Sequence, residues 1–123
     1  MRRLVAAAAA MACAFAAPAA PAQAAEAPGS QALRCVVWSS LVTDGNDDPE
    51  LVHAIQLVMT YFVGLAEGQT GKKIGDLLTP ELIEQEAANM AALEAECLPL
   101  MGDFGNRLTE LGKALQEYEG PAE

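Results

Sequence analysis

Residues 48–65 read DPELVHAIQLVMTYFVGL, and this stretch predicts a long apolar helix. Asp48 can cap its N-terminus, Pro49 suits the first helical position, and Glu50 favours the positive end of the helix dipole. Apolar residues recur every three or four positions, as expected for a helix face. A helix that is apolar on most sides is typical of the centre of a small bundle. The apolar stripe consists of Leu51, Ile55, Val58, Phe62 and Leu65, widened by Val52, Met59 and Val63.

Helical periodicity also predicts a helix before this stretch, and glycines indicate where the central helix ends. The preceding helix covers about residues 30–42, and Ser30 can cap it. We expect the central helix to end between Gly64 and Gly68, because glycine terminates helices. A flexible basic linker over 69–73 follows.

Two more helices are predicted after a short turn over 74–78. The first has Thr79 as its cap and Pro80 at its first position, and its buried face is Ile83, Ala87, Met90, Leu93 and Cys97. Pro99 either breaks the chain before the last helix or kinks it. The last helix carries the stripe Met101, Phe104, Leu108, Leu111, Leu115 and Tyr118. The predicted fold is all-α, a small bundle of three to five helices stapled by one disulfide.

The chain begins with the pattern of an export signal. Arg2 and Arg3 precede an apolar run over 4–17, and Ala22-Gln23-Ala24 is a small-x-small cleavage site. The run is shorter than the roughly 20 residues that span a bilayer. We therefore predict an exported, periplasmic bacterial protein that is free of the membrane after cleavage, with lipidation at Cys13 as an open alternative. The predicted divisions are a signal peptide over 1–24, a disordered tail over 25–29, a helical domain over 30–119 and a C-terminal tail over 120–123.

Cleavage leaves Cys35 and Cys97 as the two cysteines of the mature chain. Exported proteins meet an oxidising compartment, so we predict a disulfide between these residues. A crosslink that closes a loop of this length stabilises a fold by about 4 kcal/mol on the chain-entropy model. The alternative, a redox-active pair, lacks the Cys-x-x-Cys spacing.

The negative net charge of the chain limits the classes of partner that it can bind. The whole chain has a formal net charge of −10, and loss of Arg2 and Arg3 with the signal makes the mature chain about −12. Nucleic acids and anionic membranes are bound by clustered Lys and Arg, which this chain lacks. We expect neither as a partner. An acidic surface fits plain solubility, a basic partner or a response to acid.

Two motifs invite a catalytic or metal-binding interpretation. Asp44, Asn46 and Asp48 match the first, third and fifth positions of an EF-hand, but Pro49 stands at the sixth and Ile55 at the twelfth, where calcium loops need Gly and Glu. The single histidine, His53, has no nucleophile or orienting partner in a recognisable motif. We predict no catalytic residue, no metal site and no cofactor.

Four aromatic residues are the remaining candidates for a functional surface. Trp38, Tyr61, Phe62 and Phe104 can pack together in one core, or they can line a shallow apolar groove for a partner. The sequence leaves both arrangements open. It also leaves open the oligomeric state, a dimer included.

The cysteine pattern resembles a known family. Cys35 is followed by Trp38, a short acidic loop ends in Asp48-Pro49 at the start of a long helix, and Cys97 is followed by Pro99. This arrangement is similar to that of the HdeA/HdeB-like periplasmic acid-stress proteins. The resemblance covers about residues 34–101 and implies a small helical domain with one disulfide that holds unfolding client proteins at low pH. The longer segment between the cysteines and the last helix depart from that pattern.

A second resemblance is to the Rap1a/Tai-like immunity proteins of secretion systems, through the element Phe62-Val63-Gly64. Those proteins usually carry more cysteines than this chain. The two resemblances define the functional expectations. The first is a non-enzymatic exported protein-binding domain, in one form an acid-stress holdase chaperone. The alternative is an immunity or other interaction protein that binds one partner through its acidic face, and a small enzyme ranks third.

Overall fold

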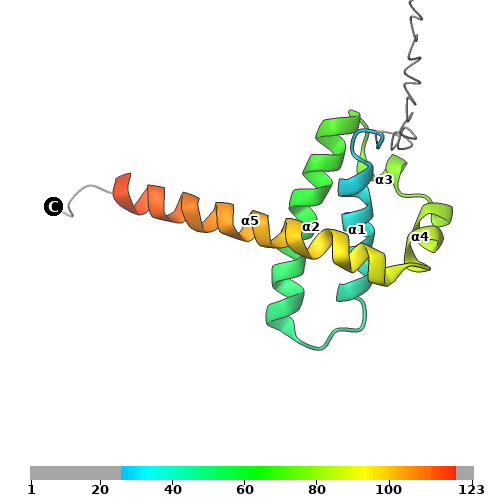
Figure 1. The fold of residues 1–123 in the computed structure, drawn as a ribbon, viewed down its shortest axis with the longest axis horizontal. Coiled ribbons are helices and arrows are strands. Elements are labelled where there is room, and N and C mark those ends of the chain that lie inside the picture. The colour runs from blue at the N-terminus through cyan, green and yellow to red at the C-terminus, as the bar shows by residue number, and fades with distance from the viewer. Residues whose placement is uncertain (1–25, 119–123) are drawn as a thin grey trace, which may run out of the picture.

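The computed structural model describes residues 26–118, which form five α-helices and no strands (Figure 1). The helices are α1 (Ser30–Thr43), α2 (Pro49–Thr70), α3 (Ile74–Leu77), α4 (Pro80–Ala87) and α5 (Met90–Tyr118). The predicted all-α bundle is confirmed. The predicted signal peptide and its cleavage site, and the C-terminal tail, lie outside the described residues.

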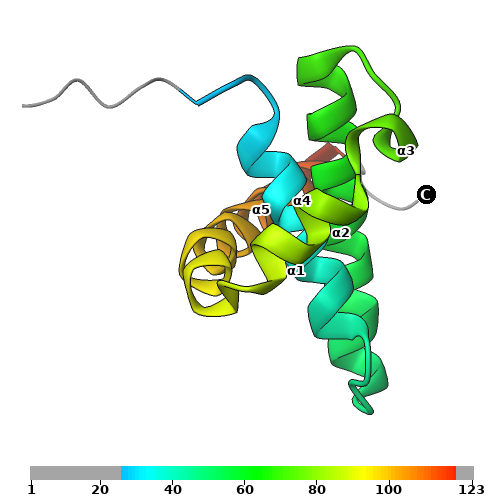
Figure 2. The same cartoon turned by 90° about the vertical axis from the view of Figure 1, so that its right-hand side faces the viewer.

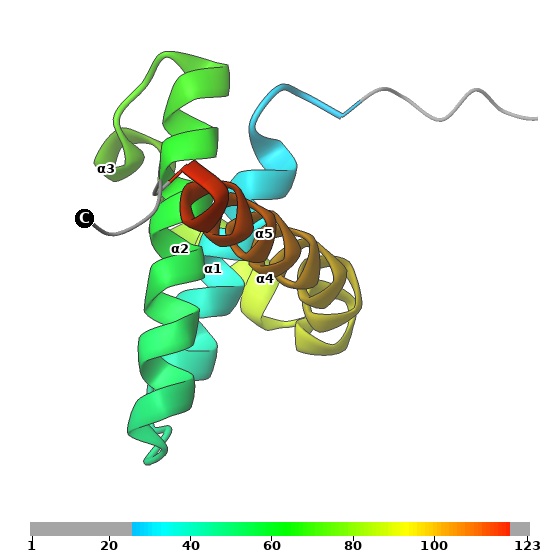
Figure 3. The same cartoon turned by 90° about the vertical axis from the view of Figure 1, so that its left-hand side faces the viewer.

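α1 and α2 form an antiparallel pair that lies side by side in all views (Figures 1 and 3). The turn between them ends at Asp48, whose carboxylate accepts hydrogen bonds from the backbone N–H groups of Glu50 and Leu51 at 3.0 and 3.3 Å. The predicted cap is therefore confirmed. By length and composition α2 could cross a membrane. In the bundle it buries one face against its neighbours, formed by Ile55, Val58, Phe62 and Ala66.

The ends of these two helices differ from the prediction because they contact each other. Ser30 is the first helical residue and not the cap, and the capping position is taken by Gly29 with φ of 82°. A Cβ atom on Gly29 would lie 2.6 Å from the Thr70 side chain. α2 continues past Gly64 and Gly68 to this contact, where its last turn meets Gly29, and it ends at Thr70 with Gly71 as its C-cap. Tertiary packing thus outweighs the low helix propensity of glycine.

Residues just before α1 also make defined contacts. The sequence predicts a disordered tail over 25–29, but the carboxylate of Glu26 accepts a hydrogen bond from Arg34 at 2.7 Å, and Gly29 is buried. This contact fixes the direction in which the chain enters α1.

α3 follows α2 and contacts it, whereas α4 packs against α1 and the start of α5. α3 is the short turn predicted over 74–78, and Thr79 caps α4 by accepting a hydrogen bond from the Leu82 N–H at 3.2 Å. Seen from the side, α4 lies over α1 (Figure 2). Its predicted inner residue Ile83 is 37% exposed, because α4 ends after two turns and does not continue in line with α5.

Of the two alternatives for Pro99, the structure excludes a helix break: α5 runs through Pro99, and the chain leaves the helix instead at residues 88–89. Proline removes one backbone hydrogen bond, to the carbonyl four residues earlier. Here that carbonyl belongs to Ala95, and both residues are exposed. Water can therefore satisfy the carbonyl, so the helix continues.

The core is built around the disulfide. Cys35 of α1 and Cys97 of α5 are bonded, with a Cα–Cα distance of 5.5 Å, and both residues are fully buried. This bond confirms the predicted staple and is compatible with an oxidising, exported location. Around it pack Val36, Trp38, Val58, Phe62 and Leu93.

The second half of α5 leaves the bundle. Met101 and Phe104 pack against the core, Arg107 bonds to Tyr61 of α2, and beyond this hydrogen bond α5 projects from the bundle (Figure 1). We call residues 105–118 the α5 arm. The rest of the predicted stripe lies on this arm and is exposed, at 40% for Leu108, 55% for Leu111, 57% for Leu115 and 88% for Tyr118.

Replacing both cysteines, Cys35→Ala with Cys97→Ala, should lower the melting temperature by more than about 15 °C, because a long closed loop is lost from the unfolded state. Circular dichroism melts of the two proteins measure the difference. A reducing agent should shift the wild type toward the variant and leave the variant unchanged. Equal melting temperatures would show that the bond contributes little.

Candidate functional site

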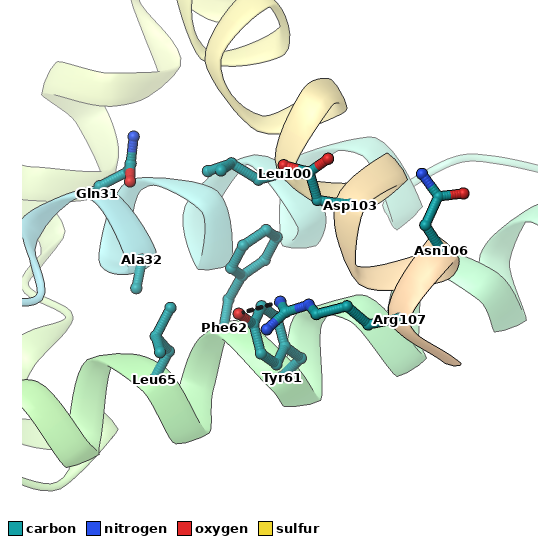
Figure 4. A pocket seen from close by; sticks show the side chains of 9 residues that line it. All are labelled: Gln31, Ala32, Tyr61, Phe62, Leu65, Leu100, Asp103, Asn106 and Arg107. Carbon is teal, nitrogen blue, oxygen red and sulfur yellow. Dashed lines mark hydrogen bonds between the residues drawn. The ribbon is translucent and has the colours of Figure 1, made fainter. Parts of the chain in front are cut away.

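A pocket of about 390 Å³ opens where α1, α2 and α5 meet (Figure 4). Its inner surface is apolar and is formed by Ala32, Phe62, Leu65 and Leu100. Its rim is polar and is formed by Gln31, Asp103, Asn106 and Arg107. Together with Tyr61 these side chains define the Tyr61 pocket. Three helices supply it, so it exists only in the folded chain.

Tyr61 forms one wall of the pocket and is held from two directions. Its ring stacks on Phe104 with centroids 4.4 Å apart and an interplanar angle of 17°. Its hydroxyl accepts a hydrogen bond from the Arg107 guanidinium at 2.6 Å. The guanidinium carbon of Arg107 also lies 5.1 Å from the ring centroid, within cation–π range. An aromatic wall is thereby fixed beside a positive charge.

The four aromatic residues proposed from sequence separate in the structure. Trp38 is 2% exposed and packs in the core, away from the pocket. Phe62 is also buried, but its ring forms part of the pocket (Figure 4). Tyr61 lines the pocket and Phe104 supports it from behind. The structure therefore places three of the four residues at or beside the site.

Sequence reasoning missed the polar rim. Gln31 and Ala32 lie 75 residues or so before Asn106 and Arg107 in the chain, and only the crossing of α1 by α5 brings them together. One local signal existed. Arg107 is one of five Lys and Arg residues after position 24, and it follows Phe104 by three positions, so both share a helix face.

An ion-pair cluster lies next to the disulfide. The guanidinium of Arg34 makes two hydrogen bonds to the carboxylate of Glu96, at 2.9 and 2.5 Å, and a third to Glu26 at 2.7 Å. The hydrogen bonds from Arg34 lower the pKa of Glu96 below its ordinary value. The same carboxylates raise the pKa of Arg34. Since Arg34 directly precedes Cys35 and Glu96 directly precedes Cys97, α1 and α5 are joined there by both an ion pair and a covalent bond.

The other sequence candidates stay apart. His53 is exposed on α2. In the loop before α2, Asn46 accepts a hydrogen bond from the Asp48 N–H at 3.0 Å, which is a turn contact. Among residues 26–118, no three His, Cys, Asp or Glu side chains are grouped so that they could hold a metal ion.

The chain matches no protein-family model, no curated protein and no solved structure. The groups that line the pocket indicate what it can bind. The pocket offers an apolar interior, one cation, one carboxylate and two amides at the rim. Such a combination suits the capture of an apolar side chain whose backbone or neighbours bond to the rim.

Glu96→Gln should lower the melting temperature at pH 7 by about 4–8 °C, the effect of exchanging a charge-assisted hydrogen bond for a neutral one. The sign with pH follows from the lowered pKa of Glu96. Stability from this carboxylate is complete above the ordinary glutamate range of about 4–5 and is lost as the pH falls through the lower folded-state pKa.

Melting curves from pH 7 to pH 2 measure this effect. The Glu96→Gln variant should show a smaller loss of stability toward acid than the wild type. Glu94→Gln, an exposed position on the same helix, is the matched control and should follow the wild type. Parallel curves for wild type and Glu96→Gln would show that the ion pair is not the acid-sensitive contact.

Proposed function

We propose that this chain is an exported, non-enzymatic protein-binding domain that anchors an apolar side chain of its partner in the Tyr61 pocket. The observation that carries the proposal is the pocket itself, a built apolar cavity beside the Arg107–Tyr61 pair. Its volume lies near the lower end of the range of about 300–1,000 Å³ for ligand sites. That size suits one or two side chains of a protein partner.

Charge supports a basic partner. The mature chain carries about 12 net negative charges, so long-range attraction steers a basic protein toward it and repels acidic ones. Asp103 extends this negative charge to the pocket rim. The disulfide and the signal-like N-terminus support the bacterial periplasm as the place of action.

The pocket can be closed without touching the core. Asn106 is exposed at the rim, so Asn106→Trp should fill the opening and leave the fold intact. Gln85→Trp, on the exposed surface of α4 outside the pocket, is the matched control. A photo-crosslinking residue placed at 106 in the producing bacterium should trap one discrete partner, and the same residue at 85 should not.

The affinity for that partner is then measured with purified proteins. We expect Asn106→Trp to weaken binding at least about tenfold, as for a change at the centre of an interface, and Gln85→Trp to leave it unchanged. Equal affinity for both variants would exclude the Tyr61 pocket as the docking site.

A second candidate function, an acid-stress holdase, is favoured by the Arg34 cluster. Protonation of Glu96 removes its negative charge from the ion pair with Arg34, so acid weakens the contact between α1 and α5. The disulfide keeps the two helices joined, which permits apolar surface to open without complete unfolding. The resemblance to the HdeA/HdeB-like proteins also supports an acid-stress holdase.

The holdase function is tested by light scattering of an aggregating client protein at pH 2–3 and at pH 7. A holdase should suppress aggregation at the acidic pH and have little effect at pH 7. A chain that stays folded and leaves aggregation unchanged at pH 2–3 would exclude this candidate and leave the pocket proposal standing.

A further inference from the structure

The α5 arm carries a stripe of exposed apolar side chains beyond the point where Arg107 bonds to Tyr61. Its exposed residues Leu108, Leu111, Leu115 and Tyr118 follow one another at steps of three, four and three. Met101 and Phe104 continue the same steps into the core. A strict 3.5-residue period is the pattern of a helix that packs along a second helix in a coiled coil. The 3.5-residue period of this stripe therefore favours a helix as the element that packs on it.

Two glycines on the arm support a close helix partner. Gly105 and Gly112 each lower helix stability by about 1 kcal/mol relative to alanine. A Cβ atom on either residue would meet nothing within 4 Å, so packing within the chain does not require them. The two glycines are seven residues apart and lie on the same flank of the leucine stripe. Because glycine has no side chain, the backbone of another helix can approach closely there.

Charge favours a second copy of this chain as the partner. The mature chain is strongly acidic, so most surfaces of two copies repel each other. The α5 arm is the exception, because it has no net charge. Its charged residues are Arg107, Glu110, Lys113 and Glu117. The arm also projects, so two copies can pair their arms while their acidic bundles stay apart (Figure 1).

We propose that two copies of this chain associate by pairing their α5 arms in an antiparallel coiled coil. This inference rests on Leu108, Leu111, Leu115 and Tyr118, none of which lines the Tyr61 pocket, and it does not rest on the proposed function. In the antiparallel register Leu108 lies opposite Leu111 of the second copy, and Gly105 lies beside Gly112 of the second copy. A parallel pair would instead bring the two acidic bundles together at one end.

The contact between the two arms is short. An arm of 14 residues is about 21 Å long, and two paired arms bury an area at or below the roughly 1,200 Å² of the smallest standard interfaces. We therefore expect a dimer that forms at high concentration and dissociates on dilution.

The dimer is tested by light scattering coupled to gel filtration, with the mature chain loaded from about 10 µM to 1 mM, a range chosen for a weak interface. The expected mass rises from monomer to dimer. Leu111→Lys with Leu115→Lys should remain a monomer throughout. Leu57→Lys, at an α2 position with similar exposure of 52%, is the matched control and should still dimerise. Circular dichroism checks that all variants fold.

Orientation is tested by cysteine crosslinking. In a mixture of Gly105→Cys and Gly112→Cys chains, an antiparallel pair should give disulfides between the two variants, whereas a parallel pair gives crosslinks within each variant. Exclusively self-crosslinked products would overturn the antiparallel arrangement. A monomer at every concentration, or a dimer that survives the Leu111→Lys and Leu115→Lys changes, would overturn the proposal and assign the arm to another partner.

Discussion

The bond between Cys35 and Cys97 is the constraint on which the rest of the structure depends. It joins the middle of α1 to the first half of α5 at the centre of the core, with Trp38, Phe62 and Leu93 packed around it. A chain of this size buries a modest apolar core, so a covalent link supplies a large share of its net stability. The bond also fixes where α5 crosses α1.

That crossing creates the candidate site. Once α5 is held against α1 at Cys97, the next three turns or so carry Leu100, Phe104 and Arg107 past α2. Phe104 then stacks on Tyr61, and Arg107 reaches the tyrosine hydroxyl. The Arg34–Glu96 ion pair reinforces the same junction from the outside. A structural staple therefore positions a pocket although neither sulfur takes part in it.

The features that sequence predicted well are local ones. The cap at Asp48, the cap at Thr79 and the apolar period of α2 each depend on residues within a few positions of one another. The errors arose where distant segments meet. Gly29 displaces Ser30 as the cap because it contacts Thr70, and the pocket joins residues from three helices. At Pro99 the helix break, one of the two predicted alternatives, does not occur, because the backbone carbonyl that loses its hydrogen bond is exposed to water.

The division of α5 into a packed half and a projecting half gives one helix two local stabilities. Residues 90–104 are held by the core and the disulfide, so their amide hydrogens open only with the bundle. Beyond Arg107, which bonds to Tyr61, the arm of a single chain has no such support, and a short isolated helix is marginal in water. We therefore expect fraying to start at the outer end of the arm and to stop at Arg107 and Phe104, which contact Tyr61.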